Sequence, residues 1–288
     1  MNKEYYINKA EEFYKNKDYQ SLFEVYIKLI EIEENSKYYF RAGLSLYMLE
    51  KYEEAIKYFE EAFDIAIKNK TDIHYYYFFY LGASYNNLGQ YNNAIKYLKM
   101  ALELSPYNYN IHRWIASSYY NMFEYKNALK YFINTLNINN EDSENFKLAG
   151  VCCSKLGNYE DAIKYLEKSI ELNNNDYNSK LWLGISYYRI DKYKYALKSL
   201  IEAKEAGIKD SDVYYYLGLS YMGVKDYFNA LENFNTHINI SKEYSINTLC
   251  SLSICYYKLK DYNNYYYTIK QIRKMQKLKT SDNSLKCI

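Results

Sequence analysis

The residues best suited to chemistry are few and widely spaced. The chain contains three histidines, which are His74, His112 and His237. Of its five cysteines, Cys152 and Cys153 are neighbours, and Cys250 and Cys255 stand five positions apart. A structural zinc site needs Cys or His in short spaced pairs of the C-x-x-C or H-x-x-x-H kind, and the sequence has neither. We therefore expect packed histidines and unpaired apolar thiols in a reducing compartment, with no metal site.

Phosphate binding and acid–base catalysis also lack their sequence signatures. No G-x-G-x-x-G or G-K-[ST] loop is present. The acid pairs Glu53–Glu54 and Glu60–Glu61 lie on either side of Lys57, which is typical of a solvated helix face. The sequence therefore predicts a protein without catalytic residues or cofactors, that is, not an enzyme.

Charge and hydropathy bear on the choice of partner. The formal net charge is only +2 over 288 residues, which does not favour nucleic-acid binding. The end from Lys270 onward carries a net charge of +5, which we interpret as a solvated helix and tail, with an anionic contact as the alternative. No signal-like apolar run or eighteen-residue apolar window is present. We expect a cytoplasmic protein that binds neither a membrane nor nucleic acid.

The dominant feature of the sequence is a repeat of about 34 residues. It is marked by a tyrosine, the register tyrosine, which recurs at intervals of 33, 39, 34, 34, 34, 34 and 35 residues. The register tyrosines are Tyr19, Tyr52, Tyr91, Tyr125, Tyr159, Tyr193, Tyr227 and Tyr262. Six central copies have Ala three residues later and Phe or Leu four residues after that.

Each repeat is predicted to form two helices joined by a short turn, because small or apolar residues recur at i, i+3, i+4 and i+7. A small residue stands nine positions before the register tyrosine; it is Gly in five copies, such as Gly82, and Ala116 in the fourth. We interpret Glu11 and Ser253 as its counterparts in the terminal copies. The small Gly and Ala positions predict close helix approach, where a large side chain would cost about 1–3 kcal/mol. Ala128 and Ala162 are accordingly expected to be buried between paired helices.

The helix ends are predicted from breaking and capping residues. Pro106 ends one second helix, and Gly207 is expected to end another. At 137–140 and 171–176 asparagines are expected to do so in the left-handed conformation. Ser143 and Ser211 are expected to start first helices. The 39-residue interval predicts a longer second helix, because the apolar run continues through 65–67.

This pattern resembles the tetratricopeptide repeat. The copy at 75–108 carries the whole pattern, in the residues Phe78, Leu81, Gly82, Tyr85, Gly89, Tyr91, Ala94, Leu98, Ala101 and Pro106. The resemblance implies an all-α, right-handed α-solenoid superhelix of about eight repeats in a single domain over 1–279, with a basic, frayed tail at 280–288. The expected repeats are 3–35, 36–74, 75–108, 109–142, 143–176, 177–210, 211–245 and 246–279.

The resemblance further implies a protein–protein interaction scaffold that binds a partner peptide or helix in a concave groove lined by the first helices. On the family's inward positions the groove residues are expected to be Tyr47, Phe79, Asn87, Arg113, Tyr120, Lys147, Tyr188, Arg189, Tyr215 and Tyr257. Their cations favour a partner with an acidic segment. The family's clamp for chaperone carboxylates is not matched, because Arg113 is followed by Ser117 and Lys147 by Val151.

Two alternatives stay open at this stage. The groove tyrosines are also explained by the chain's general tyrosine content, 42 residues in all. A peptide-sensing regulator related to repeat-containing transcription regulators is the second candidate function, although no DNA-binding segment precedes residue 3. The partner's identity, the pathway, the oligomeric state and the use of the groove rather than the convex face are left open by the sequence.

Overall fold

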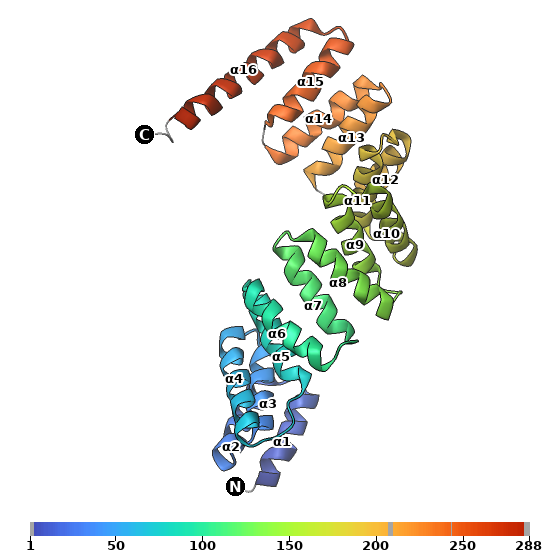
Figure 1. The fold of residues 1–288 in the computed structure, drawn as a ribbon. Helices are drawn as coiled ribbons and strands as arrows, with labels where there is room; N and C mark the ends of the chain where they lie inside the picture. The colour runs from blue at the N-terminus through green and yellow to red at the C-terminus, as the bar shows by residue number, and fades with distance from the viewer. Residues whose placement is uncertain (1–2, 207–209, 243, 285–288) are drawn as a thin grey trace. The chain divides into compact units, whose positions relative to one another are not determined.

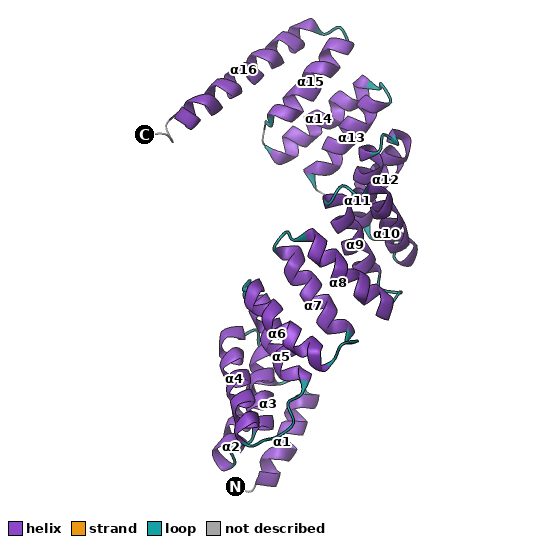
Figure 2. Ribbon diagram, viewed as in Figure 1, coloured by secondary structure: helices purple, strands orange, loops and turns teal. Residues whose placement is uncertain are grey.

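The computed structural model describes residues 3–206, 210–242 and 244–284, and helices are the only regular secondary structure in them (Figure 2). The described helices form eight pairs. The first helices are α1 (Lys3–Lys15), α3 (Ser36–Met48), α5 (Tyr75–Asn87), α7 (Tyr109–Asn121), α9 (Ser143–Lys155), α11 (Tyr177–Arg189), α13 (Ser211–Gly223) and α15 (Ile246–Lys258). The second helices are α2 (Tyr19–Ile32), α4 (Tyr52–Lys68), α6 (Tyr91–Leu104), α8 (Tyr125–Ile138), α10 (Tyr159–Leu172), α12 (Tyr193–Glu205), α14 (Tyr227–Ser241) and α16 (Tyr262–Ser284).

The predicted register is confirmed at both helices of every pair. Each second helix begins at a register tyrosine, and each first helix begins at the first residue of an expected repeat. The all-α class and the eight helix pairs are therefore confirmed. The last helix, α16, continues to Ser284 and so extends past position 279, where the helical repeat was expected to end. Residues 285–288 of the expected tail lie outside the described residues.

By its contacts the chain divides into two compact units, Met1–Glu141 and Asp142–Ile288. We call them the N-terminal and the C-terminal unit. Within each unit the helix pairs follow one another along the chain (Figure 1). The expected single domain over 1–279 stays a prediction.

The small residues of the pattern lie where paired helices touch. A Cβ atom added to Gly82 would stand 2.5 Å from Cγ of Leu98, and one on Gly184 would stand 2.5 Å from Cγ of Leu200. Such distances are well inside van der Waals contact, so a side chain there would force the helices apart. Ala128 and Ala162 are completely buried, as expected.

One residue of the sequence interpretation was misplaced. In the first copy the small position is occupied by Ala10, which is buried, whereas Glu11 is exposed. Ala10 stands nine residues before Tyr19, so it keeps the common spacing and Glu11 does not. The last copy carries Ser253 at this position, and that serine is buried as expected.

The turn inside each repeat has one backbone conformation throughout. Two residues before every register tyrosine the chain is left-handed, with φ between +56° and +83°. These residues are Lys17, Glu50, Gly89, Phe123, Gly157, Asp191, Lys225 and Lys260. The next N–H then donates back across the turn, as Gln90 N does to Tyr85 O at 2.9 Å, and this bond closes the end of the first helix. Only two of the eight copies use glycine, which is the residue that takes this conformation without strain.

The ends of the second helices differ from the prediction. Asn139 and Asn173, which follow α8 and α10, are extended, with φ of −138° and −143°. The expected left-handed asparagines are therefore wrong at these positions, because the chain passes straight into the next repeat. Gly207 lies outside the described residues. The helix-capping side chains are Asp142 and Asp210, one residue before Ser143 and Ser211, which are the first helical residues.

The 39-residue repeat takes up its extra residues in two places. Helix α4 has 17 residues whereas the next second helix, α6, has 14. The expected longer helix is confirmed, because Ile65 and Ala66 are buried on its core face. The loop after α4 is also longer, since α5 begins only at Tyr75.

Replacing Ala128 by Leu is expected to lower the thermal unfolding midpoint, because the added atoms would overpack a fully buried contact at a cost of about 1–3 kcal/mol. Circular dichroism during heating measures the change. Lys130→Ala, two residues away on the exposed face of α8, should leave the midpoint nearly unchanged. Equal effects of the two substitutions would contradict the packing described here.

Replacing Lys225 by Gly is expected to raise the thermal midpoint, because an exposed non-glycine residue at φ +66° carries strain of roughly 1–2 kcal/mol. Gly157→Ala should lower the midpoint, since Gly157 has φ +83°. Lys225→Ala is the control, because it removes the charge and keeps the Cβ atom. A rise with Lys225→Ala as large as with Lys225→Gly would show that backbone strain is not the cause.

Candidate partner-binding surface

The first helices form the more tightly packed layer of each unit. Neighbouring first helices contact one another, α3 with α5 and α5 with α7 in the N-terminal unit, and α9, α11, α13 and α15 in succession in the C-terminal unit. In the part of the chain that the structure describes, no two second helices make a comparable contact. All ten predicted site residues lie on first helices, five in each unit.

In the N-terminal unit, Tyr47 and Asn87 are brought together from neighbouring repeats. The amide of Asn87 donates to the Tyr47 hydroxyl at 3.4 Å. The Tyr47 ring also packs edge to face on Tyr52 and Tyr80, with centroids 5.4 Å apart in both pairs. Burial of the ring raises the pKa of Tyr47, so its hydroxyl stays protonated at neutral pH.

The other three predicted residues of this unit differ in their surroundings. Tyr120 packs on Tyr125 and Phe132 and is half-buried. Phe79 is half-buried and meets the edge of Tyr80 at 5.1 Å. Arg113 is exposed and makes no ion pair with any described residue. Arg113 is thus the one of the three whose polar group faces solvent unpaired.

The C-terminal unit contains a cleft of about 320 Å³ that includes Arg189. Residues of four neighbouring elements line it: Ser154, Lys155, Tyr159, Asn178, Leu181, Trp182, Ile185, Arg189, Asp210, Asp212 and Tyr216. The Lys155 ammonium lies 4.7 Å from the centre of the Trp182 ring, within the range of a cation–π interaction. The cleft therefore combines aromatic faces with two cations, Lys155 and Arg189, and two carboxylates, Asp210 and Asp212.

Arg189 is positioned by two tyrosines. Its guanidinium donates to the Tyr216 hydroxyl at 3.3 Å and lies 5.9 Å from the centre of the Tyr216 ring. The Tyr188 ring packs against Tyr216 at 5.8 Å and against Tyr193 at 6.0 Å. Burial raises the pKa of the Tyr188 hydroxyl. The predicted pair Tyr188 and Arg189 is therefore part of an ordered cluster at the edge of the cleft.

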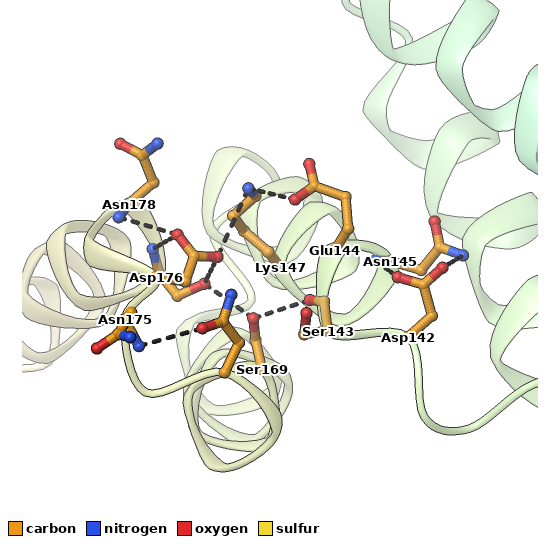
Figure 3. Close-up of polar contacts among 11 residues, drawn as sticks. Asp142, Ser143, Glu144, Asn145, Lys147, Ser169, Asn175, Asp176 and Asn178 are labelled. Atoms are coloured by element: carbon orange, nitrogen blue, oxygen red, sulfur yellow. Dashed lines mark hydrogen bonds and ion pairs between the residues drawn. The ribbon is translucent and has the colours of Figure 1, made fainter.

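Lys147 is held by contacts inside its own unit (Figure 3). Its ammonium lies 2.5 Å from a carboxylate oxygen of Glu144 and 3.5 Å from one of Asp176. Asp176 also caps α11 by accepting from the backbone N–H groups of Asn178 and Ser179. Only 16% of the Lys147 side chain is exposed. The position of Lys147 was predicted from the repeat, but its engagement in an ion-pair network was not.

The two remaining predicted residues have different environments. Tyr215 is half-buried against Phe234 and His237 of α14, with ring centroids 6.0 and 5.3 Å away. Tyr257 on α15 is 53% exposed and packs on Tyr262 and Tyr265. Tyr215 therefore packs α13 against α14, whereas the ring of Tyr257 is accessible to a partner.

The sequence prediction missed one repeat position on the first-helix surface, which we call the fifth-position column. Five positions after the first residue of these helices stand Arg41, Tyr80, Trp182 and Tyr216, and all four line clefts. The predicted columns stood one, four, eight, eleven and twelve positions after that residue. On an α-helix the positions one, five, eight and twelve form one continuous stripe, so the helical period itself could have identified this column.

Neither a metal-binding group nor an activated buried thiol is found among the described residues. No group of three or more His, Cys, Asp or Glu that could hold a metal is found among them. Burial raises the pKa of Cys152 to about 12 and that of Cys255 to about 11, which keeps both thiols protonated and weakly reactive. His112 is buried, with Nε2 2.8 Å from the carbonyl oxygen of Pro106. Of the helices described, none has the length and apolar character needed to cross a membrane.

Comparison with known proteins gives two matching family models. A tetratricopeptide repeat model matches residues 36–69, and a model described as anaphase-promoting complex, cyclosome, subunit 3 matches residues 87–169. No curated protein matches the sequence. The two matched segments cover most of the second repeat, and the chain from the last residue of α5 in the third repeat through most of the fifth.

Solved structures with the same fold are numerous. The C-terminal part of a TPR repeat-containing protein from Cytophaga hutchinsonii has a TM-score of 0.68 at 22% identity, over 85% of this chain and 98% of that one. YrrB, described as a TPR protein with an unusual peptide-binding site, has a TM-score of 0.56 at 22% identity, over 65% and 93%. The Cut9–Hcn1 hetero-tetramer of APC/C has a TM-score of 0.54 at 16% identity, over 93% and 52%.

These similarities agree with the chain's own geometry. The matched repeat model at 36–69 covers the whole of α3 and α4, and the same helix pair recurs through the described residues. The small residue nine positions before each register tyrosine and the left-handed turn two positions before it recur in the same way. The second repeat therefore matches the tetratricopeptide repeat model, and the chain has the fold of solved tetratricopeptide repeat proteins.

Proposed function

We propose that the chain is a non-enzymatic interaction scaffold that binds a partner peptide or helix on its first-helix surface, the concave side of a repeat stack. The observation that carries this proposal is the cleft of the C-terminal unit, where Arg189 and Lys155 lie against the faces of Tyr216 and Trp182. Rigid aromatic side chains and arginine are the residues that contribute most to protein–protein binding.

The chemistry of the cleft suits an extended peptide or a helix better than a small metabolite. Its walls come from loops and helices of successive repeats, and they offer the partly exposed ring of Trp182 beside polar groups at Asn178 and Asp212. A partner that alternates apolar and charged groups would satisfy both kinds of wall. The printed description of YrrB, which shares the fold, includes a peptide-binding site, and this likeness supports the proposal.

The predicted cations contribute unequally in this proposal. Arg113 in the N-terminal unit and Arg189 in the C-terminal unit are exposed. Lys147 is already paired with Glu144 and Asp176 and would have to leave both to contact a partner. We therefore assign the attraction of an acidic segment to the two arginines and to Lys155, and a structural role to Lys147.

Tyr188→Ala is expected to weaken partner binding by about 1–3 kcal/mol, because it removes an aromatic anchor beside Arg189. The partner is first isolated from native cell extract by pull-down and identified by mass spectrometry. Its affinity for each variant is then measured by calorimetry. Arg189→Gln should weaken binding mainly at low salt, since exposed charges are screened over about 8 Å at physiological ionic strength.

Phe228→Ala is the matched control, because Phe228 is a 68% exposed aromatic residue on a second helix of the same unit. Its removal should leave the affinity unchanged. Thermal melts of each variant separate lost binding from lost folding. If Phe228→Ala loses the partner and Tyr188→Ala keeps it, the partner binds the second-helix face and the proposed surface is wrong.

A further inference from the structure

Three clefts of the N-terminal unit share two residues, Arg41 of α3 and Tyr14 of α1, and Arg41 is the charged one of the two. The first is lined by Tyr14, Tyr19, Leu22, Tyr26, Leu44, Ser45, Met48 and Tyr80 beside Arg41. The second lies between Arg41 and residues of α1 and α2, and the third between Arg41 and residues of α5. Arg41 therefore stands at the point where the clefts of three successive repeats meet.

The guanidinium of Arg41 is exposed and has no ion pair or hydrogen-bond partner among the described residues. Its own backbone is fixed, because the Ser45 hydroxyl donates to the Arg41 carbonyl oxygen at 2.9 Å. An arginine offers five donors in a planar fork that matches a carboxylate. A fixed backbone with an unpaired fork is the arrangement expected of a residue that binds an external anion.

Helices α3 and α5, which flank Arg41 on two of the clefts, carry no negative charge that could neutralise it. Helix α3 contains Lys37 and Arg41 but no Asp or Glu, and α5 contains no charged residue at all. The single carboxylate that lines any of the three clefts is Glu11 of α1, which makes no ion pair with Arg41. The surface around Arg41 is thus electropositive, and the complementary partner group is an anion.

The tyrosines around Arg41 add neutral donors and apolar faces. Burial raises the pKa of Tyr76 to about 12, and it raises the pKa of Tyr26 and Tyr80 although Arg41 opposes the shift. These hydroxyls are therefore protonated at neutral pH and able to donate to an oxyanion. Because the protonated tyrosines are neutral, Arg41 supplies the charge in the first cleft. A ligand group with a single negative charge, such as a carboxylate, matches that charge.

An apolar surface lies directly beside the charge. Leu22, Leu44 and Met48 line the first cleft with Arg41, and 46% of Met48 is exposed. Exposed methionine beside leucine is an adaptable surface for an apolar side chain. A ligand that meets both groups at once needs a carboxylate and an apolar side chain a few ångströms apart.

We propose that Arg41 binds the side-chain carboxylate of an Asp or Glu in an acidic peptide segment, whose neighbouring large apolar residue occupies the cleft of Leu22, Leu44 and Met48. The inference rests on the proposed function and adds to it the partner's chemical class and a second anchoring point, in the N-terminal unit.

The test uses peptides selected from a random twelve-residue phage-display library on the immobilised full chain. The most enriched peptides are then synthesised with a fluorescent label and titrated by anisotropy. We expect them to contain Asp or Glu beside a large apolar residue. Arg41→Gln should weaken their binding by roughly tenfold or more. Arg41→Lys should restore part of the loss, because it returns the charge without the planar fork.

Lys57→Gln is the charge-matched control, since Lys57 is exposed on the second helix α4 of the same unit. It should leave the affinity unchanged, and thermal melts should show that all variants are folded. Selected peptides that lack an acid, or that bind Arg41→Gln as well as the native chain, overturn the assignment.

The two proposals fail in distinguishable ways. Peptides that lose binding with Arg189→Gln and keep it with Arg41→Gln leave the proposed scaffold function standing and disprove the Arg41 site. Absence of any enriched peptide on the folded chain counts against both.

Discussion

The close approach of the two helices in each repeat is the constraint on which the rest of the structure depends. At Gly43, Gly150 and Gly218 an added Cβ atom would stand 2.6–2.8 Å from a Phe or Leu side chain of the paired helix. Glycine inside a helix costs about 1 kcal/mol relative to alanine. The gain from the dense contact of Phe59, Leu166 or Phe234, all completely buried, outweighs that cost. Because the contact fixes the rotation of both helices, it also fixes which residues face the next repeat and which face solvent.

A second set of small residues sets the distance between successive first helices. Ser118 donates to Asn86 at 2.8 Å and thereby joins α7 to α5, and Ser186 donates to Ser154 at 3.3 Å and joins α11 to α9. The Ser118 and Ser186 hydroxyls are completely buried, and each also lies within 2.9 Å of the carbonyl oxygen four residues earlier in its own helix, so its single hydrogen is shared between the two acceptors. That carbonyl belongs to Trp114 or Trp182, in the column that stands five positions into the first helix. The buried serines therefore lie at the contact between first helices, and the tryptophans one turn earlier lie on the first-helix surface, where a partner can reach them.

The sequence allowed the fold to be predicted down to the first residue of each helix, because the contact between paired helices demands a small residue at a fixed spacing. The features that it missed are those that depend on contacts between repeats. Lys147 was predicted as a groove cation from its position, but its charge is matched by Glu144 and by Asp176, the residue that caps α11 of the next repeat. The chain is extended at Asn139 and Asn173, where a left-handed turn was expected after the second helix, and a left-handed residue recurs inside every repeat, mostly at Lys, Glu, Asp and Phe. Residue type is a poor guide there because tertiary packing overrides the intrinsic preference for glycine.

The abundance of tyrosine has a physical explanation in the joints between repeats. Tyr85 stacks on Tyr97 of its own repeat, with ring planes 2° from parallel, and its hydroxyl donates to Glu60 of the preceding repeat at 3.4 Å. Tyr187 makes the equivalent bond to Glu167 at 2.6 Å. Burial and the nearby carboxylate raise the pKa of Tyr85 to about 12, so the hydroxyl remains a donor throughout the physiological range. Phenylalanine could fill the same space but would leave the glutamate without this donor, since an aromatic ring edge cannot replace a hydroxyl. Tyrosine thus meets two requirements of a repeat joint at once, apolar packing between helices and a polar group at the boundary with water, and the same property makes it suitable on the first-helix surface where a partner would bind.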